Sequence, residues 1–222
     1  MFRRRAANAH RSGPPRPKDV NVTARRIIVA SALAILAGGC ALNRPHVKSL
    51  RDKTADRIQF DTVVETTVSA LNAIPSKCGP TADHRVRAEE FQVYRVVGTV
   101  VRVKRERDHD IHIVLADVNH PRDHLVIESD DPDFRDNVIS PYREKLVTAR
   151  RMFDALLAGT GVQRLENLKG TVVRVTGVGF FDINHFQVGR SRSCLELHPM
   201  LAIERVDSEH AAIRDGLVYY VW

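Results

Sequence analysis

Apolar and polar residues alternate through residues 91–104, which places Phe91, Val93, Val97, Val101 and Val103 on one side of an extended chain. This period of two predicts a long β-strand, and a glycine near its middle, Gly98, allows the strand to bend sharply. Residues 110–117 and 124–129 repeat the alternation, each after a polar turn. The pattern therefore predicts three consecutive strands.

The spacing changes to that of a helix after Ser140 and Pro141, which are typical of an N-cap and a first helical position. An apolar stripe follows at helical spacing, formed by Leu146, Ala149, Phe153, Leu156 and Leu157. We expect this helix to end at Gly159. Two more strands are predicted at residues 170–179 and 194–206, the second interrupted by Pro199.

The segments on either side of this region have weaker patterns. Residues 40–60 are polar with little period, as in a flexible tether, and residues 61–74 have the apolar spacing of a short helix. Residues 75–87 are rich in turn-forming residues and predict a loop. The tail, residues 207–222, ends in an apolar and aromatic stretch that either packs on the rest of the protein or offers a strand to a partner protein.

Three strands, a helix and two strands are the order of elements in the OB-fold. The stretches V-V-G-T-V-V-R-V-K (96–104), D-I-H-I-V-L-A-D (110–117) and L-K-G-T-V-V-R-V-T-G (168–177) resemble strands one, two and four of OB domains. The resemblance implies a mostly β protein with a five-stranded barrel over residues 88–206. V-T-G-V-G-F-F-D-x-x-H and the later E-L-H-P-x-L also resemble uncharacterised exported bacterial OB-fold proteins, so the resemblance implies a fold and not a function.

The charge of the chain lies almost entirely in residues 1–39. The net charge is +7, from 34 basic and 27 acidic residues. Residues 1–39 hold eight of these bases and one acid, which leaves 26 of each sign in residues 40–222. Without its N-terminal segment the protein is neutral, and this balance does not favour nucleic acid as its partner.

Residues 1–39 have the features of a secretory signal. Arg25 and Arg26 precede the apolar run Ile27–Ala37, which is too short to span a bilayer, and small residues follow it. Leu36-Ala37-Gly38-Gly39-Cys40 resembles the lipobox of bacterial lipoproteins, with the leucine one place early. The resemblance implies lipidation of Cys40 and a membrane anchor in the cell envelope. The alternative is a cut after Ala41 and release into the periplasm.

Export would also place the two remaining cysteines in an oxidising compartment. Cys78 and Cys194 form an even pair, which in an oxidising compartment favours a disulfide. Such a bond ties the segment before the first strand to the last strand. The alternative is two free thiols.

Two loops are the expected ligand site, because OB domains commonly bind ligands between the loop that joins strands one and two and the loop that joins strands four and five. Here these are residues 104–110 and 180–193. They offer stacking rings, hydrogen-bond donors and cations: Arg105, Arg107, His109, Phe181, His185, Phe186, Gln187, Arg190 and Arg192. This set suits an anionic or glycan polymer. The alternative is that the phenylalanines fill the end of the barrel and the arginines are only solvated.

Acids and histidines form a second group of candidates, which suits a divalent metal ion: Asp110, His112, Asp182, His185, Glu196 and His198. Alternation places Asp110 with His112, and Glu196 with His198, on polar strand faces. The spacing matches no metal motif, so a hydrogen-bonded structural role is the alternative. Motifs of serine hydrolases, P-loops and dinucleotide sites are absent from the sequence, and thermonucleases resemble it only in architecture.

Three functions remain open. The first is a lipid-anchored envelope protein whose OB barrel binds an anionic or sugar-containing ligand and needs no cofactor. The second is a metal-dependent hydrolase of the phosphodiesterase or nuclease type. The third is a structural envelope protein that contacts another protein through its aromatic tail. The composition of the loops favours binding over catalysis.

Overall fold

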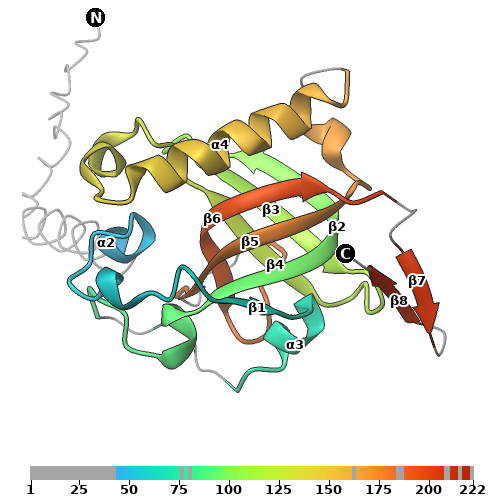
Figure 1. The fold of residues 1–222 in the computed structure, drawn as a ribbon, viewed down its shortest axis with the longest axis horizontal. Helices are drawn as coiled ribbons and strands as arrows, with labels where there is room; N and C mark the ends of the chain where they lie inside the picture. The colour runs from blue at the N-terminus through green and yellow to red at the C-terminus, as the bar shows by residue number, and fades with distance from the viewer. Residues whose placement is uncertain are drawn as a thin grey trace, which may run out of the picture. The chain divides into compact units, whose positions relative to one another are not determined.

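The computed structural model of the protein describes residues 44–75, 78–79, 82–161, 164–183, 188–207, 211–214 and 217–220. At its centre five strands form a closed barrel (Figure 1). They are β2 (Val93–Arg105), β3 (Ile111–Asp117), β4 (His124–Ser129), β5 (Val172–Phe181) and β6 (Leu195–Arg205). Neighbouring strands follow the order β2-β3-β4-β6-β5, and β5 pairs with β2 to close the ring.

This topology is that of the OB-fold, which confirms the predicted fold class. β4 and β6 run parallel, and the other pairs of the barrel are antiparallel. The register of β2 against β3 shifts between Val100 and Arg102, just after Gly98, where the sequence predicts a bend. β6 continues through Pro199 instead of breaking there. The pairing of β5 with β6 is irregular around Gly177, opposite this part of β6, so the missing N–H of proline is accommodated.

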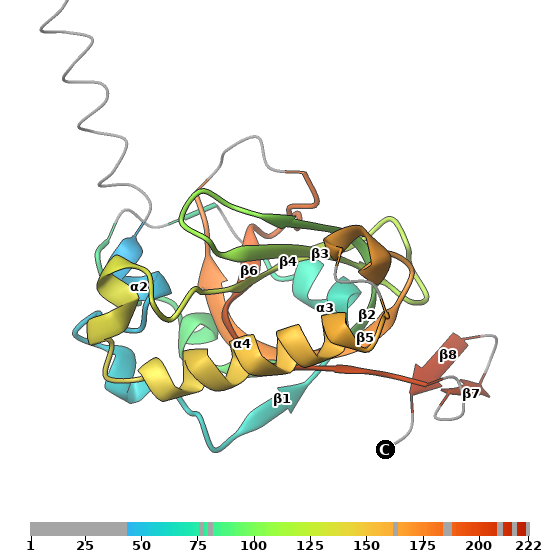
Figure 2. The ribbon, with the colours of Figure 1, turned by 90° about the horizontal axis from the view of Figure 1, so that it is seen from above.

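The helix α4 (Arg143–Ala158) connects β4 to β5 and lies along one side of the barrel (Figure 2). It begins three residues after Ser140, whose hydroxyl oxygen accepts a hydrogen bond from the Tyr142 amide at 3.2 Å. Ala149 and Phe153, from the predicted apolar stripe, belong to the main hydrophobic core. Inward-facing residues of the strands complete this core, among them Ile111, Ile113, Leu115, Leu125, Ile127, Leu195 and Leu197.

The segment predicted to be a tether packs against the barrel. It contains α2 (Pro45–Lys48) and the 3-10 turn η1 (Ala55–Arg57), and it is followed by β1 (Val63–Glu65), which pairs in parallel with β2. Leu50 and Ile58 are buried in a second hydrophobic cluster with Val93 and Val178. From residue 44 onward the chain is therefore part of the fold. Its apolar residues show no regular spacing because the segment is built of short turns, and none of them is long enough to leave a helical or strand pattern.

Two other short segments differ from the predicted pattern. The short helix expected over residues 61–74 is divided between β1 and α3 (Val68–Asn72). In the tail, β7 (Ala211–Arg214) and β8 (Leu217–Tyr220) form a two-stranded antiparallel sheet of their own. Among the described residues, we find no helix with the length and apolar character needed to cross a membrane.

Candidate functional site

A groove of about 580 Å³ opens on the outer surface of β2 and β3. Its walls also include the 3-10 turn η4 (Leu165–Leu168) with the residue after it, and Val188 and Gly189 of the β5–β6 loop. The lining residues are Val101, Arg102, Val103, Val114, His124, Glu166, Lys169, Val188 and Gly189. The groove therefore combines an apolar floor of valines with two exposed basic side chains, Arg102 and Lys169, and one exposed acid, Glu166. It borders one of the two loops between which OB domains commonly bind ligands, the β5–β6 loop.

The β5–β6 loop reaches this groove because it is fastened to α3. The Ser193 hydroxyl donates a hydrogen bond to the Leu71 carbonyl at 2.8 Å, and the Arg192 amide donates one to Asn72 Oδ1 at 2.9 Å. Gly189 has φ +86°, and a Cβ at this position would lie 2.3 Å from Val114 Cγ1. Only glycine allows the loop to lie this close to β3. Val188, beside it, is 63% exposed at the rim of the groove.

The cysteine prediction is confirmed, since Cys78 and Cys194 form a disulfide with their Cα atoms 5.1 Å apart. The bond joins the segment before the barrel to the start of β6. The Arg190 guanidinium lies against it, with Nη1 3.4 Å from the sulfur of Cys78 and 3.5 Å from that of Cys194. Arg190 thus covers the disulfide.

The basic residues predicted to face one another across two loops lie at opposite ends of β3. Arg192 forms an ion pair with Asp123 in the β3–β4 turn, at 3.0 Å. His109, in the β2–β3 turn, lies 3.3 Å from the Asp131 carboxylate and packs its ring against Phe134. Arg105 and Arg107 are exposed in and beside the same turn. Among the described residues of the two loops, Arg192 and the basic residues of the β2–β3 turn therefore do not share one surface.

Phe181, predicted to stack on a ligand, is fully buried in the main core. Its neighbour Phe180 is also fully buried. Both rings therefore pack inside the protein and are not exposed to a ligand. Gly179 allows the chain to fold tightly here, because a Cβ at this position would lie 2.2 Å from the Glu89 carbonyl oxygen. The other predicted ligand residues of this loop, His185, Phe186 and Gln187, lie outside the described residues, as does Cys40.

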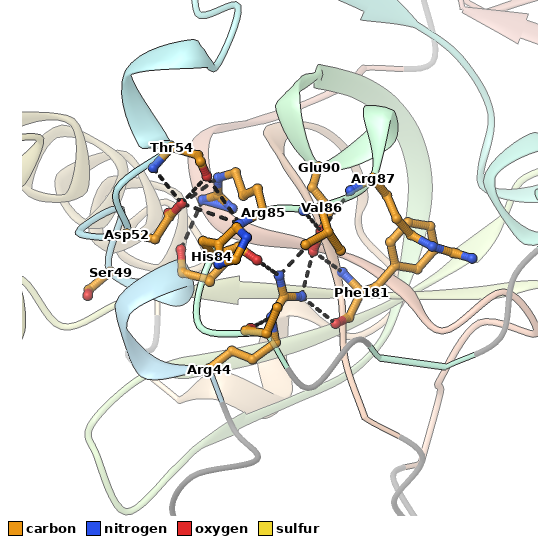
Figure 3. A network of polar contacts seen from close by, with 12 residues as sticks. Arg44, Ser49, Asp52, Thr54, His84, Arg85, Val86, Arg87, Glu90 and Phe181 are labelled. Carbon is orange, nitrogen blue, oxygen red and sulfur yellow. Dashed lines mark hydrogen bonds and ion pairs between the residues drawn. The ribbon is translucent and has the colours of Figure 1, made fainter.

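A first buried polar cluster holds the N-terminal segment on the barrel (Figure 3). We call Arg44, Asp52, Arg85 and Glu90 the balanced cluster. Arg44 pairs with Glu90 at 2.5 Å and donates to the carbonyl oxygens of residues 82, 84 and 181. Arg85 Nε lies 3.6 Å from Asp52 Oδ2. Each buried cation of this cluster faces one buried carboxylate, so the charges cancel.

A second buried polar cluster lies on the outer faces of β4 and β6. We call Asp110, Glu128, Asp130, Glu196 and His198 the acidic cluster. The pairing of Ile127 with Leu197 places Glu128 beside Glu196 and His198. His198 Nδ1 lies 2.9 Å from Glu128 Oε2, and its Nε2 lies 3.1 Å from Asp130 Oδ1. Four carboxyl groups thus surround one imidazole.

One lysine from the N-terminal segment reaches this cluster. Lys48 Nζ lies 3.5 Å from Glu128 Oε2. Burial lowers the pKa of Lys48, but Glu128, Asp182, Glu196 and Asp130 outweigh burial and raise this pKa overall. Lys48 therefore stays charged and offsets one carboxylate.

Protons offset part of the remaining charge. Burial raises the pKa of Glu196 well above its usual value, and the charges of Glu128 and Asp182 raise it further. Burial and the Asp130 carboxylate raise the pKa of Asp110 to about 8. Burial lowers the pKa of His198, but Asp130 and Glu128 outweigh it and bring this pKa to about 10. At neutral pH these three groups therefore keep protons in the folded protein that the same groups would lose if they were exposed to water.

The structure brings together part of the predicted metal set. Asp110, Glu196 and His198 lie in the acidic cluster, and Asp182 is buried close enough to affect Glu196. His112 is buried opposite Glu128 in the β3–β4 pair, and burial lowers its pKa. His185 lies outside the described residues.

Three residues of this site were not predicted from the sequence: Glu128, Asp130 and Lys48. Alternation along residues 124–128 already indicates that Glu128 lies on the strand face of His124, opposite the apolar Leu125 and Ile127. No pattern in the sequence indicates Lys48, because it lies in a segment without period.

Comparisons with known proteins add little to this geometry. No family model and no curated protein matches the chain significantly. Among solved structures, the chain is similar to asparaginyl-tRNA synthetase of Entamoeba histolytica, with 12% identity over 65% of this chain and 24% of that one and a TM-score of 0.32. It is also similar to apo TiaS, a tRNAIle2 agmatidine synthetase, with 13% identity over 55% of this chain and 31% of that one and a TM-score of 0.21. The chain thus spans a third or less of either neighbour, and at these scores neither likeness indicates a function.

Proposed function

We propose that this protein is an exported OB-fold binding module that holds an anionic glycan in the groove on β2 and β3. The observation that carries the proposal is the composition of this groove. Valines form its floor, and Arg102 and Lys169 are exposed at its edge. Sugar rings have apolar faces that pack on such a floor, while carboxylate or phosphate groups of the polymer pair with the two cations.

The groove is built on rigid elements, which favours binding with little loss of entropy. Its floor comes from paired barrel strands, and the hydrogen bonds from Ser193 and Arg192 hold the β5–β6 loop on α3. A glycan also fits the neutral charge of residues 40–222 better than a nucleic acid does, because nucleic-acid affinity depends largely on neutralising many phosphates.

The proposed location is the cell envelope. Two observations support it: the signal-like residues 1–39 and the disulfide between Cys78 and Cys194, a bond typical of oxidising compartments. Expression of the full chain in a bacterium and mass spectrometry of the mature protein test the location. A chain that begins at a lipidated Cys40 supports anchoring, and one that begins at Leu42 supports release. An uncut chain in the cytoplasm contradicts export.

Binding is tested with the purified full chain and three probes: alginate as an anionic glycan, dextran as a neutral glycan and an oligothymidylate as a nucleic acid. We expect alginate to bind most tightly. Replacing both Arg102 and Lys169 with alanine should weaken alginate binding by about tenfold or more, which corresponds to about 1.4 kcal/mol. Arg151→Ala, which removes an exposed cation from α4, is the matched control and should leave the affinity unchanged.

Two outcomes count against the proposal. One is alginate binding that the double variant does not weaken. The other is tighter binding of the oligothymidylate than of alginate, which would identify a nucleic-acid module instead. Failure of all three probes to bind would also reject the anionic glycan.

A further inference from the structure

Three side chains of the acidic cluster present metal-ligating atoms to one another. These are Glu128, Glu196 and His198, whose ligand atoms all lie within 4.8 Å of one another. Glu196 is fully buried, yet neither of its carboxylate oxygens has a hydrogen-bond partner. A buried carboxylate without partners is costly unless a proton or a cation neutralises it. Glu196 is therefore neutralised by a proton or by a bound cation.

His198 is oriented as a metal ligand. Its Nε2 lies 3.1 Å from Asp130 Oδ1, so in the neutral imidazole an N–H on Nε2 donates to this carboxylate and the lone pair is on Nδ1, once a metal ion has displaced the second proton. Nδ1 lies 2.9 Å from Glu128 Oε2 but outside hydrogen-bond geometry, since it has no hydrogen-bond partner. Metal-bound histidines are commonly fixed in this way by a carboxylate on the far nitrogen.

The charge around these atoms also favours a cation. Lys48 offsets one carboxylate, and its ammonium lies 3.5 Å from the Glu128 oxygen. Glu196 and Asp130 remain beside it, in a site that excludes water. A divalent ion would replace the protons that otherwise neutralise this cluster.

We propose that Glu128, Glu196 and His198 bind one divalent metal ion, with zinc as the best match, which joins β4 to β6. Zinc accepts one imidazole and carboxylate oxygens at about 2.0–2.2 Å, so its ligand atoms lie about 3.3 Å apart around a tetrahedron. Here His198 Nδ1 lies 2.9 Å from Glu128 Oε2, and the three ligand atoms all lie within 4.8 Å of one another. Three protein ligands leave the fourth position of the tetrahedron to a second carboxylate oxygen or a water, and burial of all three ligands keeps that position away from a substrate. The proposed role of the ion is therefore structural, and the inference does not depend on the groove.

Zinc binding is tested on the purified full chain, dialysed after exposure to zinc in the presence of manganese and calcium. We expect about one zinc ion per chain by elemental mass spectrometry. A hundredfold excess of zinc over its Kd should raise the melting temperature by about 5–10 °C. Glu196→Gln keeps the shape of the side chain but removes a ligand, so it should reduce bound zinc at least tenfold and abolish the rise in melting temperature.

Glu204→Gln is the matched control, because Glu204 is exposed on the same strand and pairs with Arg174. This variant should keep one zinc ion per chain. If Glu196→Gln does not fold, X-ray absorption at the zinc edge of the wild-type protein decides the question. Nitrogen and oxygen ligands with one imidazole support the site. A sulfur ligand, no bound zinc, or equal zinc in folded Glu196→Gln overturns the proposal.

Discussion

The balanced cluster and the acidic cluster are both buried against the same N-terminal segment, yet their charges differ. In the balanced cluster Arg44 faces Glu90 and Arg85 faces Asp52. In the acidic cluster four carboxyl groups share His198 and a single lysine, Lys48. The two cations Arg44 and Lys48 lie four residues apart at α2, and each enters one cluster.

The difference indicates that the two clusters have different tasks. A buried ion pair whose partners are all present holds two segments together, and removing one partner is costly. A cluster with an excess of carboxylates stores protons or binds a cation, because the interior does not tolerate unpaired charge. The first cluster therefore fastens the N-terminal segment, and the second is where we expect a ligand.

The largest expected effect is in the balanced cluster. Arg44→Ala leaves Glu90 buried without its partner and should reduce the free energy of unfolding by about 3–5 kcal/mol, measured by denaturant unfolding. Arg57→Ala is the control from the same segment. Arg57 is exposed and stacks on Phe91, so its loss should cost about 1 kcal/mol or less. Equal, small effects of both substitutions would mean that residues 44–60 are a tether after all.

A smaller loss is expected when the acidic cluster loses its lysine. Lys48→Met keeps the length of the side chain but leaves the Glu128 carboxylate without its ammonium. The free energy of unfolding should fall by about 2 kcal/mol in metal-free buffer. If zinc binds as proposed, it should restore much of this loss, because it supplies positive charge to the same carboxylate. If zinc restores none of the lost free energy of unfolding, Lys48 and the proposed metal ion do not act on the same carboxylate.

The third effect is a stabilisation that depends on pH and vanishes in acid. Burial and the Asp130 charge raise the pKa of Asp110 to about 8, while His198 opposes them. The folded protein is thus favoured below pH 4, where Asp110 is protonated in both states, and loses this advantage as the pH rises toward 8. Asp110→Asn removes the ionisation, so its free energy of unfolding should exceed that of the wild type increasingly as the pH rises from 4 to 8, with little difference at pH 4. Unfolding at pH 4, 6 and 8 measures this, and a difference independent of pH contradicts it.

Much of the barrel could be predicted because strands and helices leave local patterns. The alternation through residues 91–104, 110–117 and 124–129 corresponds to β2, β3 and β4, and the stripe after Ser140 corresponds to α4. The order of these elements was enough to indicate the OB-fold. The outward direction of Glu196 and His198 also followed from alternation, because neighbouring side chains on a strand point to opposite faces.

The sequence by itself therefore determined the fold class, the barrel strands and the polar faces, since each depends on residues close together along the chain. Only the tertiary structure decided the partners. Arg44 meets Glu90 across 46 positions, and His198 meets Asp130 across 68. The groove likewise joins β2, η4 and the β5–β6 loop. Such contacts leave no local period, because they depend on how the closed barrel brings distant segments side by side.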